Sequence, residues 1–144
     1  MTAPVFVDTN VHFYAFDDTD PVKRDVARAW RVSLWGSGRG RTSFQVLQEF
    51  YFQASRKFPH AKDAIRAEVR NLLTWRPVPI DASILQSSWD VQDRFRLSFW
   101  DALIVAAAQS ASCRYLLTED LQADQDLDGI QIVNPFLRTF ESLD

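Results

Sequence analysis

The residues of this sequence that are best suited to chemistry are acids that follow or interrupt uncharged segments. Asp8 comes directly after residues 4–7, and Asp120 lies just beyond residues 115–118. Asp101 is the single charged residue of the run 99–111. A cluster of carboxylate oxygens is the ligand set that Mg²⁺ or Mn²⁺ prefers, with coordination positions left for water and substrate phosphate. If the fold brings these acids together, they predict metal-dependent chemistry on a phosphate group.

Other metal and thiol chemistries are excluded by composition. Cys113 is the only cysteine, and His12 and His60 are the only histidines. An internal disulfide is therefore impossible, and a zinc site built from cysteine and histidine cannot form. Any metal must be held by oxygen ligands.

Composition predicts one globular domain over residues 1–144. The chain is 47% hydrophobic and 24% charged, with 4 glycines and 6 prolines, which excludes disordered and collagen-like classes. Its longest apolar run, residues 102–108, is far shorter than the roughly 20 residues that cross a bilayer. Residues 1–5 also lack the basic start of a signal peptide. We therefore expect a cytoplasmic protein without a membrane partner.

The net charge of −3 is unevenly distributed along the chain. Residues 1–80 carry 12 basic and 8 acidic side chains, whereas residues 81–144 carry 4 basic and 11 acidic ones. The basic half can attract phosphate, while the acidic half can supply metal ligands or contact a basic partner. Charge counts alone favour the simpler interpretation that both are solvated surfaces.

Hydrophobic patterning places the acids on an alternating series of strands and helices. Short β-rich segments predict strands at residues 4–7, 77–80, 115–118 and 130–133. Apolar positions at helical spacing predict helices at residues 11–16, 21–36, 44–58, 61–73, 84–95 and 98–111. The glycine cluster at 36–41 is interpreted as a flexible loop that carries two arginines, because it lacks the pattern of a phosphate-binding loop.

Strands that alternate with helices predict a three-layer α/β/α fold around a central, mainly parallel twisted sheet. Ligands of such sheets bind just beyond the carboxyl ends of the strands. Asp8, Asp81 and the pair Glu119 and Asp120 should lie at that edge. Asp101 should project from the first turn of its helix, so we expect the acids to converge.

Several of these acids also have a simpler structural explanation. Asp8 can serve only as a helix N-cap, and Ser98 with Asp101 forms a capping box. Neither role excludes metal binding, because a carboxylate has two oxygens. Most acids of the segment 119–128 should be solvated surface.

Helical periodicity argues against a site role for Glu49. The helix at 44–58 has an apolar stripe formed by Phe44, Leu47, Tyr51, Ala54 and Phe58, and the helix at 21–36 has one formed by Val22, Val26, Ala29, Trp30 and Leu34. Glu49 lies nearly opposite the first stripe, where a solvent-facing glutamate is expected.

Five motifs, in this order, resemble those of PIN-domain ribonucleases, in particular VapC-type toxins. They are FVDTNV at 6–11, QVLQEF at 45–50, FWDALIVAA at 99–107, LLTEDLQ at 116–122 and VNPF at 133–136. The resemblance covers essentially the whole chain and implies a PIN-like fold. It also implies a Mg²⁺- or Mn²⁺-dependent endoribonuclease that cleaves single-stranded RNA. A cognate VapB-like antitoxin would silence it in a type II toxin–antitoxin system.

The resemblance assigns roles to individual residues. It implies four catalytic and metal-binding acids, Asp8, Glu49, Asp101 and Asp120, supported by hydrogen bonds from Asn10 and Thr118. The acidic segment departs from the family pattern, because Asp124, Asp126 and Asp128 precede Gly129. The choice of Asp120 over Glu119 or Asp124 as the fourth acid is therefore a separate prediction.

Contacts with RNA and with protein partners are also predicted. Candidate phosphate contacts are Arg39, Arg41, Arg56 and Lys57. The chain has more large aromatic residues than one small core needs, namely Trp30, Trp35, Phe52, Trp75 and Trp89. Some of them are expected at a homodimer interface or in an antitoxin-binding groove, although ordinary core positions explain them equally well.

Two alternative functions remain open at this point. A phospho-aspartate phosphatase or receiver domain also has an acid after its first strand. The phosphatase pattern, however, needs an acid where Asn10 stands, and a receiver needs a lysine at a strand end. The second alternative is a non-catalytic PIN-like scaffold that binds a protein partner. Metal-dependent cleavage of RNA distinguishes the enzyme from both.

Overall fold

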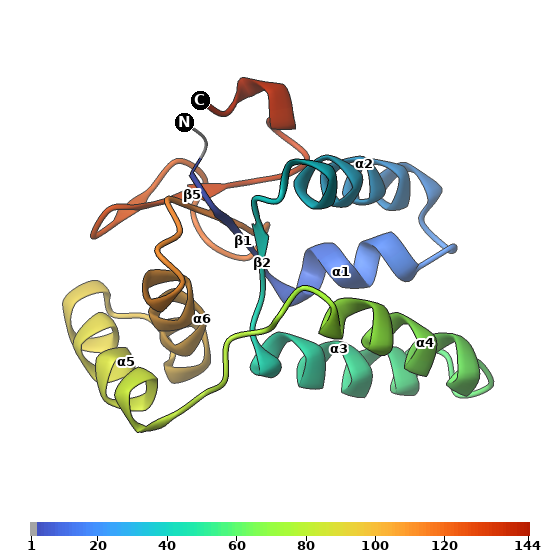
Figure 1. Ribbon diagram of the computed structural model, residues 1–144, viewed down its shortest axis with the longest axis horizontal. Coiled ribbons are helices and arrows are strands. Elements are labelled where there is room, and N and C mark those ends of the chain that lie inside the picture. The colour runs from blue at the N-terminus through green and yellow to red at the C-terminus, as the bar shows by residue number, and fades with distance from the viewer. Residues whose placement is uncertain (1–2) are drawn as a thin grey trace.

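A five-stranded sheet runs through the centre of the computed structural model, which describes residues 3–144 (Figure 1). The strands are β1 (Val5–Val7), β2 (Gly40–Arg41), β3 (Tyr115–Leu117), β4 (Asp126–Leu127) and β5 (Ile130–Val133). Their order is β2-β1-β3-β5-β4, and every pairing is parallel except that of β4 with β5. The prediction of a mainly parallel sheet is confirmed.

Helices connect β1 to β2 and β2 to β3, and one short turn follows β5. They are α1 (Thr9–Phe16), α2 (Pro21–Ser37), α3 (Phe44–Lys57), α4 (Lys62–Leu73), α5 (Ala82–Phe95), α6 (Phe99–Ser110) and the 3₁₀ turn η1 (Phe140–Ser142). Most begin at a side chain that accepts a hydrogen bond from a backbone N–H of the first turn, as Ser43 does for α3 and Ser98 for α6. Pro21 stands at the first position of α2, where no N–H is needed.

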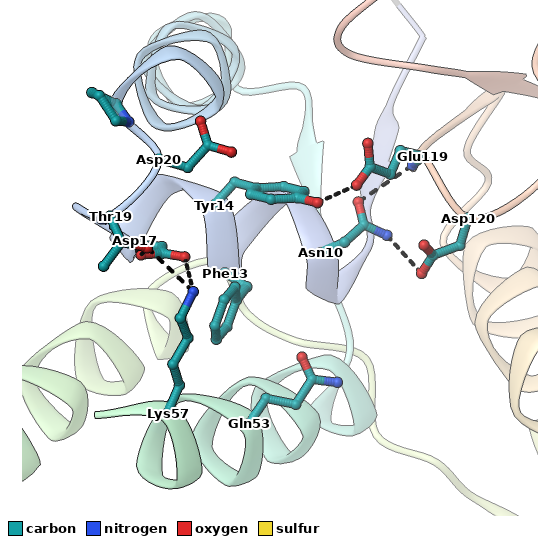
Figure 2. Close-up of a pocket in the computed structure, with 11 residues that line it drawn as sticks. Asn10, Phe13, Tyr14, Asp17, Thr19, Asp20, Gln53, Lys57, Glu119 and Asp120 are labelled. Carbon is teal, nitrogen blue, oxygen red and sulfur yellow. Dashed lines mark hydrogen bonds and ion pairs between the residues drawn. The ribbon is translucent and has the colours of Figure 1, made fainter. Parts of the chain in front are cut away.

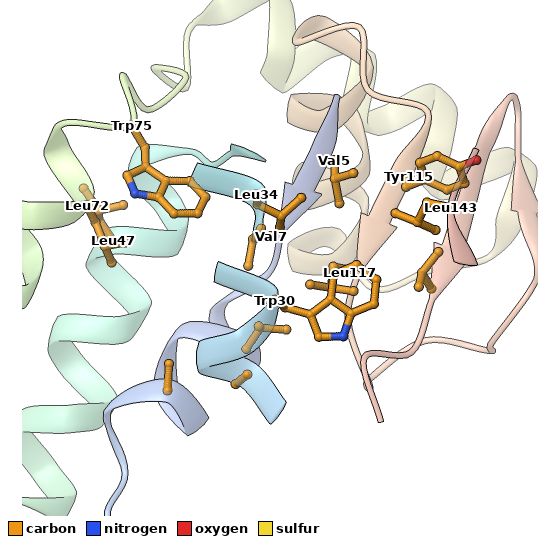
Figure 3. Close-up of a cluster of buried hydrophobic side chains, with 14 residues drawn as sticks. Val5, Val7, Trp30, Leu34, Leu47, Leu72, Trp75, Tyr115, Leu117 and Leu143 are labelled. Carbon is orange, nitrogen blue, oxygen red and sulfur yellow. The ribbon is translucent and has the colours of Figure 1, made fainter. Parts of the chain in front are cut away.

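The sheet separates two hydrophobic cores, as expected for three layers. Val5, Val7 and Leu117 point to one face, where they pack with Trp30 and Leu34 of α2 (Figure 3). The alternate strand residues point to the other face, which is covered by α5 and α6. Because α6 is buried on nearly all sides by its neighbours, its apolar run needs no polar face.

The predicted apolar stripes of α2 and α3 are only partly buried. Leu34 and Ala54 lie in the core, but Val22 is 76% exposed and Tyr51 is 36% exposed. The buried face of α3 is instead centred on Val46 and Phe50 and is rotated from the predicted one. Periodicity identified the helices but not their orientation, because surface aromatic residues fit the same spacing.

The interpretation of residues 36–41 as a flexible loop is wrong. Gly38 ends α2 in the left-handed conformation at φ 72°, which glycine adopts without strain. Gly40 and Arg41 then form the edge strand β2, paired with β1. Arg39 is buried, and its guanidinium donates to the carbonyl oxygens of Ala3 and Asp144. This segment therefore forms one edge of the sheet.

Residues 77–80 do not form the predicted strand. Only a single bridge joins Val78 to Ser43, because Pro77 and Pro79 lack the N–H that a ladder of hydrogen bonds needs. Asp81, expected at the carboxyl edge of the sheet, is exposed and serves as the N-cap of α5. It accepts a hydrogen bond from the backbone of Ile84 at 3.0 Å.

The large aromatic residues divide between core and surface. Trp30 and Trp75 are buried, whereas Trp35, Phe52 and Trp89 are all more than half exposed. Core positions therefore explain the two buried tryptophans, and the three exposed residues remain candidates for an interface. None of the helices formed by residues 3–144 has the length and hydropathy that a membrane crossing requires.

Gly40→Ala is expected to lower the free energy of unfolding by about 1–3 kcal/mol, the usual cost of overpacking a core. A methyl group at this position would overlap the buried indole ring of Trp75. Urea unfolding measures the change. Gly36→Ala is the matched control, because no atom lies within 4 Å of the added carbon. Since Gly36 lies within α2, its replacement should raise stability by about 0.5–1 kcal/mol. Equal effects of the two variants would contradict the packing described.

Candidate active site

The pairing of β1 with β3 brings two polar residues to the same sheet edge. The backbone N–H of Asp8 donates to the carbonyl of Leu117 at 3.0 Å, and that of Thr118 donates to the carbonyl of Val133 at 3.0 Å. Asp8 and Thr118 are thus the first residues beyond adjacent parallel strands. The Thr118 hydroxyl donates to Oδ2 of Asp8 at 2.9 Å, which joins the two side chains directly.

Asp8 combines a structural role with a place in the site. Its Oδ1 accepts a hydrogen bond from the backbone of Thr9 at 2.7 Å, as the N-cap of α1. Its Oδ2 accepts the bond from Thr118 instead. The N-cap explanation is correct, and it leaves the second oxygen directed to the site.

Asn10 links the acids that follow β3. Its amide nitrogen donates to Oγ1 of Thr118 at 2.9 Å and to Oδ2 of Asp120 at 3.0 Å. Its amide oxygen accepts from the backbone N–H of Glu119 at 3.3 Å. Figure 2 shows Asn10 between the two acids, with its nitrogen toward Asp120. Asn10 and Thr118 therefore support both Asp8 and Asp120, as the sequence resemblance implies.

Glu49 faces the other acids, contrary to the helical-wheel interpretation. It lies at the margin of the buried face of α3, and its Oε1 accepts a hydrogen bond from the hydroxyl of Thr9 at 2.9 Å. The wheel was wrong because the buried face is rotated toward Val46 and Phe50. The expectation from family resemblance, that Glu49 joins the site, agrees with this placement.

Asp101 completes the group from the opposite layer. Ser98 Oγ accepts the backbone N–H of Asp101 at 3.1 Å, so the cap of α6 does not occupy the Asp101 carboxylate. A cavity of about 90 Å³ at the carboxyl edge of the sheet is lined by Asp8, Glu49, Asp101 and Asp120. Thr9, Asn10, Gln53, Trp100 and Ile104 form the rest of its wall. The structure brings all four predicted acids together.

Negative charge is concentrated and partly buried in this cavity. Burial raises the pKa of Asp8 to about 7, and the nearby carboxylates of Asp120 and Glu49 add to the rise. Burial also raises the pKa of Glu49, with further contributions from Asp101 and Asp120. The acids therefore repel one another, and a bound cation would stabilise their ionised forms.

The donor set fits a divalent cation. Its members are carboxylate oxygens without nitrogen or sulfur ligands, which suits Mg²⁺ or Mn²⁺. As arranged in residues 3–144, no three acidic, histidine or cysteine side chains are grouped closely enough to hold a metal ion. Hydrogen bonds from Thr9, Asn10 and Thr118 hold three of the carboxylates in place. A divalent cation would offset the repulsion among them.

Glu119 and Asp124 lie outside the carboxylate cavity. Glu119 accepts a hydrogen bond from the Tyr14 hydroxyl and forms an ion pair with Lys23 at 3.0 Å. Asp124 lies 3.9 Å from Arg138. Asp120 lines the carboxylate cavity, whereas Glu119 does not.

The predicted phosphate contacts are not gathered at the site. Arg39 donates to the backbone oxygens of Ala3 and Asp144, and Arg41 lies on β2 level with Phe6, so neither lines the carboxylate cavity. Arg56 is exposed on α3 and lies over the ring of Phe52. Lys57 remains near the site but forms an ion pair with the buried Asp17 at 2.7 Å.

A second cavity, of about 610 Å³, adjoins the first (Figure 2). The two share Asn10, Gln53 and Asp120 in their walls. Phe13 and Lys57 line the second cavity, with Phe13 rising between α1 and α3. The carboxylates therefore lie at one end of a longer depression.

Sequence reasoning missed four residues of the carboxylate cavity. Thr9 follows Asp8 directly, and Trp100 and Ile104 lie on either side of Asp101, so these three stand inside motifs that were recognised. Gln53 lies one helical turn after Glu49. Spacing of i to i+4 from a site residue is the signal that could have found it.

The PIN domain family model matches residues 5–127, a range that includes all four acids of the cavity. The chain belongs to the PIN domain family. Comparison with the sequences of curated proteins gives no match. The PIN domain match agrees with the order of the five motifs and leaves the phospho-acceptor alternative without support.

Solved structures share the fold of this PIN domain. A chain of a toxin–antitoxin complex from Klebsiella pneumoniae has a TM-score of 0.67 at 20% identity, covering 91% of this chain and 97% of that chain. VapC20 of Mycobacterium tuberculosis, a Sarcin-Ricin loop cleaving toxin, has a TM-score of 0.61 at 23% identity, with 78% and 86% covered. A chain of DNA-bound VapBC from Salmonella typhimurium has a TM-score of 0.66 at 18% identity, with 91% and 97% covered. The predicted PIN-like α/β fold is confirmed.

Asp8→Asn is expected to stabilise the metal-free protein increasingly as pH rises from about 4 to about 7. Burial raises the pKa of the Asp8 carboxyl from its ordinary value of 3.8 to about 7 in the folded protein. The folded state retains this proton longer than the unfolded state, so the wild type loses stability over that range. Asparagine keeps the N-cap without the charge. At about pH 7 the free energy of unfolding of Asp8→Asn should exceed that of the wild type by on the order of 2–4 kcal/mol.

Urea unfolding in the presence of EDTA at several pH values measures this difference. Asp90→Asn, at an exposed position of α5, is the matched control and should change stability little at any pH. A difference between Asp8→Asn and the wild type that stays constant across the range would contradict a buried and repelled carboxylate.

Proposed function

We propose that this PIN domain is a Mg²⁺- or Mn²⁺-dependent endoribonuclease that cleaves single-stranded RNA. The observation that carries the proposal is the convergence of four acids from separate elements on one cavity at the carboxyl edge of the sheet. A buried group of like charges is costly unless a cation offsets it, so a purely structural role does not account for it. An enzyme that hydrolyses phosphodiester bonds can use such a group of acids to bind its metal ions.

The comparisons support nuclease chemistry in particular. The chain belongs to the PIN domain family, and the similar VapC20 is described as a toxin that cleaves the Sarcin-Ricin loop. A non-catalytic scaffold would have no need for the hydrogen bonds that hold three of the four acids. Thr9 holds Glu49, Asn10 holds Asp120 and Thr118 holds Asp8, and these three donor residues are themselves partly or fully buried.

The proposed roles follow from the contacts of each side chain. Asp8 and Asp101 are the inner ligands, and Glu49 and Asp120 complete the acidic site. A bound Mg²⁺ or Mn²⁺ would lower the pKa of a water molecule and neutralise charge on the scissile phosphate. Thr118 and Asn10 orient Asp8 and Asp120 through the hydrogen bonds described above.

We also propose that the protein acts in the cytoplasm as the toxin of a VapBC-like pair. Similar chains come from toxin–antitoxin complexes of Klebsiella pneumoniae and Salmonella typhimurium. The proposed partner is a VapB-like antitoxin that inserts a cationic side chain into the carboxylate cavity. The exposed Trp35, Phe52 and Trp89 are candidates for that interface or for a homodimer contact.

Asp101→Asn is expected to abolish Mg²⁺-dependent cleavage of single-stranded RNA by the purified protein. The loss should exceed the roughly 10–100-fold that changes around a metal ligand cause. Because the Asp101 side chain does not cap α6, the fold should be unaffected. Gel analysis with Mg²⁺, Mn²⁺ or EDTA measures cleavage, and sequencing of the new ends locates it. Full activity of Asp101→Asn would refute the site, and inactivity of the wild type with every RNA tested would favour the scaffold.

The same pair of proteins tests the toxin role. Expression of the wild type alone should arrest the growth of a bacterial host, whereas expression of Asp101→Asn should not. Immunoblotting establishes that both proteins accumulate. Normal growth with active wild-type protein present would contradict a toxin role without affecting the nuclease assignment.

Asp120→Asn is expected to lower metal affinity or cleavage rate by about 10–100-fold. Asp120 lines the cavity and shares Asn10 with the Asp8 network. Glu119→Gln and Asp124→Asn are the matched controls, because neither acid lines the carboxylate cavity and each lies beside a cation of its own. Initial rates across a Mg²⁺ titration compare the three variants. A defect confined to Glu119→Gln or Asp124→Asn would overturn the choice of Asp120.

A further inference from the structure

Trp100 is an exposed aromatic residue in the wall of a charged cavity. It is 62% exposed, yet it lines the same cavity as Asp8, Glu49 and Asp101. It lies in the first turn of α6, directly before Asp101 in the sequence. The other strongly exposed tryptophans, Trp35 and Trp89, do not line this cavity.

The position of Trp100 is fixed by buried neighbours. The side-chain nitrogen of Gln45, which is 5% exposed, donates to the Trp100 carbonyl at 3.2 Å. The ring of Phe99 meets the Trp100 ring edge-on, with centroids 5.1 Å apart and planes at 68°. Phe99 in turn packs against a core that contains Leu103. Trp100 is therefore held by its neighbours while its side chain remains exposed to solvent.

Charge does not provide much affinity for RNA near this site. The nearest lysines are already engaged, Lys23 by Glu119 and Lys57 by Asp17. The carboxylates themselves repel phosphate unless a cation is bound. A strand whose backbone crosses this cavity needs attraction that does not depend on its charge, and stacking of bases on aromatic rings provides it for any sequence.

The neighbouring cavity suggests the path of the strand. It shares Asn10, Gln53 and Asp120 with the carboxylate cavity, and the ring of Phe13 extends from α1 toward α3 in its wall (Figure 2). Trp100 belongs to the carboxylate cavity alone. A strand can therefore pass from Trp100 across the acids and into the larger cavity, so that the cleaved bond lies next to the base on Trp100.

We propose that Trp100 stacks on the nucleobase that flanks the cleaved phosphodiester bond of single-stranded RNA. The inference rests on the proposed nuclease function. Trp100 acts here as a binding and positioning residue, and it takes no part in proton transfer or metal binding. It increases affinity for bases of any type, in contrast to a residue that reads base edges.

The test uses a fluorescein-labelled single-stranded RNA centred on the bond that the wild-type protein cleaves. Anisotropy measures its Kd for Asp8→Asn protein, which should not cut it, with and without Trp100→Ala. Trp100→Ala should weaken binding by about 5–150-fold, the range expected from losing one stacked base. Trp100→Phe should restore much of the affinity. Trp89→Ala, which removes another exposed tryptophan, should leave it unchanged.

An abasic series makes the test specific to one nucleotide. Removing the base that flanks the cleaved bond should weaken binding to the Asp8→Asn protein, but should have little further effect once Trp100 is alanine. In cleavage assays on an otherwise wild-type background, Trp100→Ala should raise KM far more than it lowers kcat.

Failure of this inference is distinguishable from failure of the proposed function. If the wild type cleaves RNA but Trp100→Ala binds and cleaves as well as its parent, the stacking role is overturned and nuclease function stands. Trp100 would then belong to a protein interface. An abasic effect that persists in full without Trp100 would also overturn the role. If the wild type neither binds nor cleaves RNA, both proposals are overturned.

Discussion

Repulsion among the carboxylates at the edge of the sheet is the constraint on which the site depends. Asp8 and Glu49 are drawn out of water and toward other acids, so their ionisation is unfavourable in the folded protein. Hydrogen-bond donors that the fold holds in place limit the free-energy cost of ionising these two acids. Thr9 reaches both acids, through its backbone N–H to Asp8 and its hydroxyl to Glu49, and Thr118 reaches the other oxygen of Asp8. The arrangement costs stability when empty of cations and gains from binding them.

The surrounding cations support the structure more than they attract a substrate. Lys57 neutralises Asp17, which is 2% exposed, and Lys23 neutralises Glu119 beside Tyr14. Arg39 ties the first strand to the end of the chain. The basic first half of the sequence thus largely serves intramolecular contacts. Because its lysines near the site are paired, the cavity keeps a negative potential, which favours a divalent ion over a monovalent one.

The sequence predicted the helices, three of the five strands and the four acids of the cavity, but for different reasons. Strands β1, β3 and β5 and the helices follow from apolar spacing, which burial enforces. Glu49 could be placed only through family resemblance, because the aromatic residues Phe44 and Tyr51 imitate a buried stripe while facing solvent. Hydrophobic spacing predicts that a segment is helical. The neighbouring elements that pack on the helix decide which of its faces is buried.

The errors at 36–41 and 77–80 share a physical origin in backbone hydrogen bonding. Gly40 and Arg41 form a strand only because β1 offers an unpaired edge, which no local pattern reveals. Residues 77–80 had suitable strand side chains, but Pro77 and Pro79 cannot donate. Asp81 was misplaced as a direct result, since its predicted position depended on that strand. Short edge elements depend on tertiary pairing more than on their own sequence.

The hydrogen bond between Thr118 and Asp8 joins positions separated by 110 residues of chain. During synthesis, β1 and α1 leave the ribosome long before β3 is available to pair with them. Asp8, Glu49 and Asp101 are all made before Thr118 and Asp120, so a nascent chain contains most of the acids but not the strand that aligns them. The cavity can form only after β3 and the residues that follow it, up to Asp120, have left the ribosome. For a protein proposed to cut RNA, this topology would delay assembly of the acidic site until that part of the chain is made.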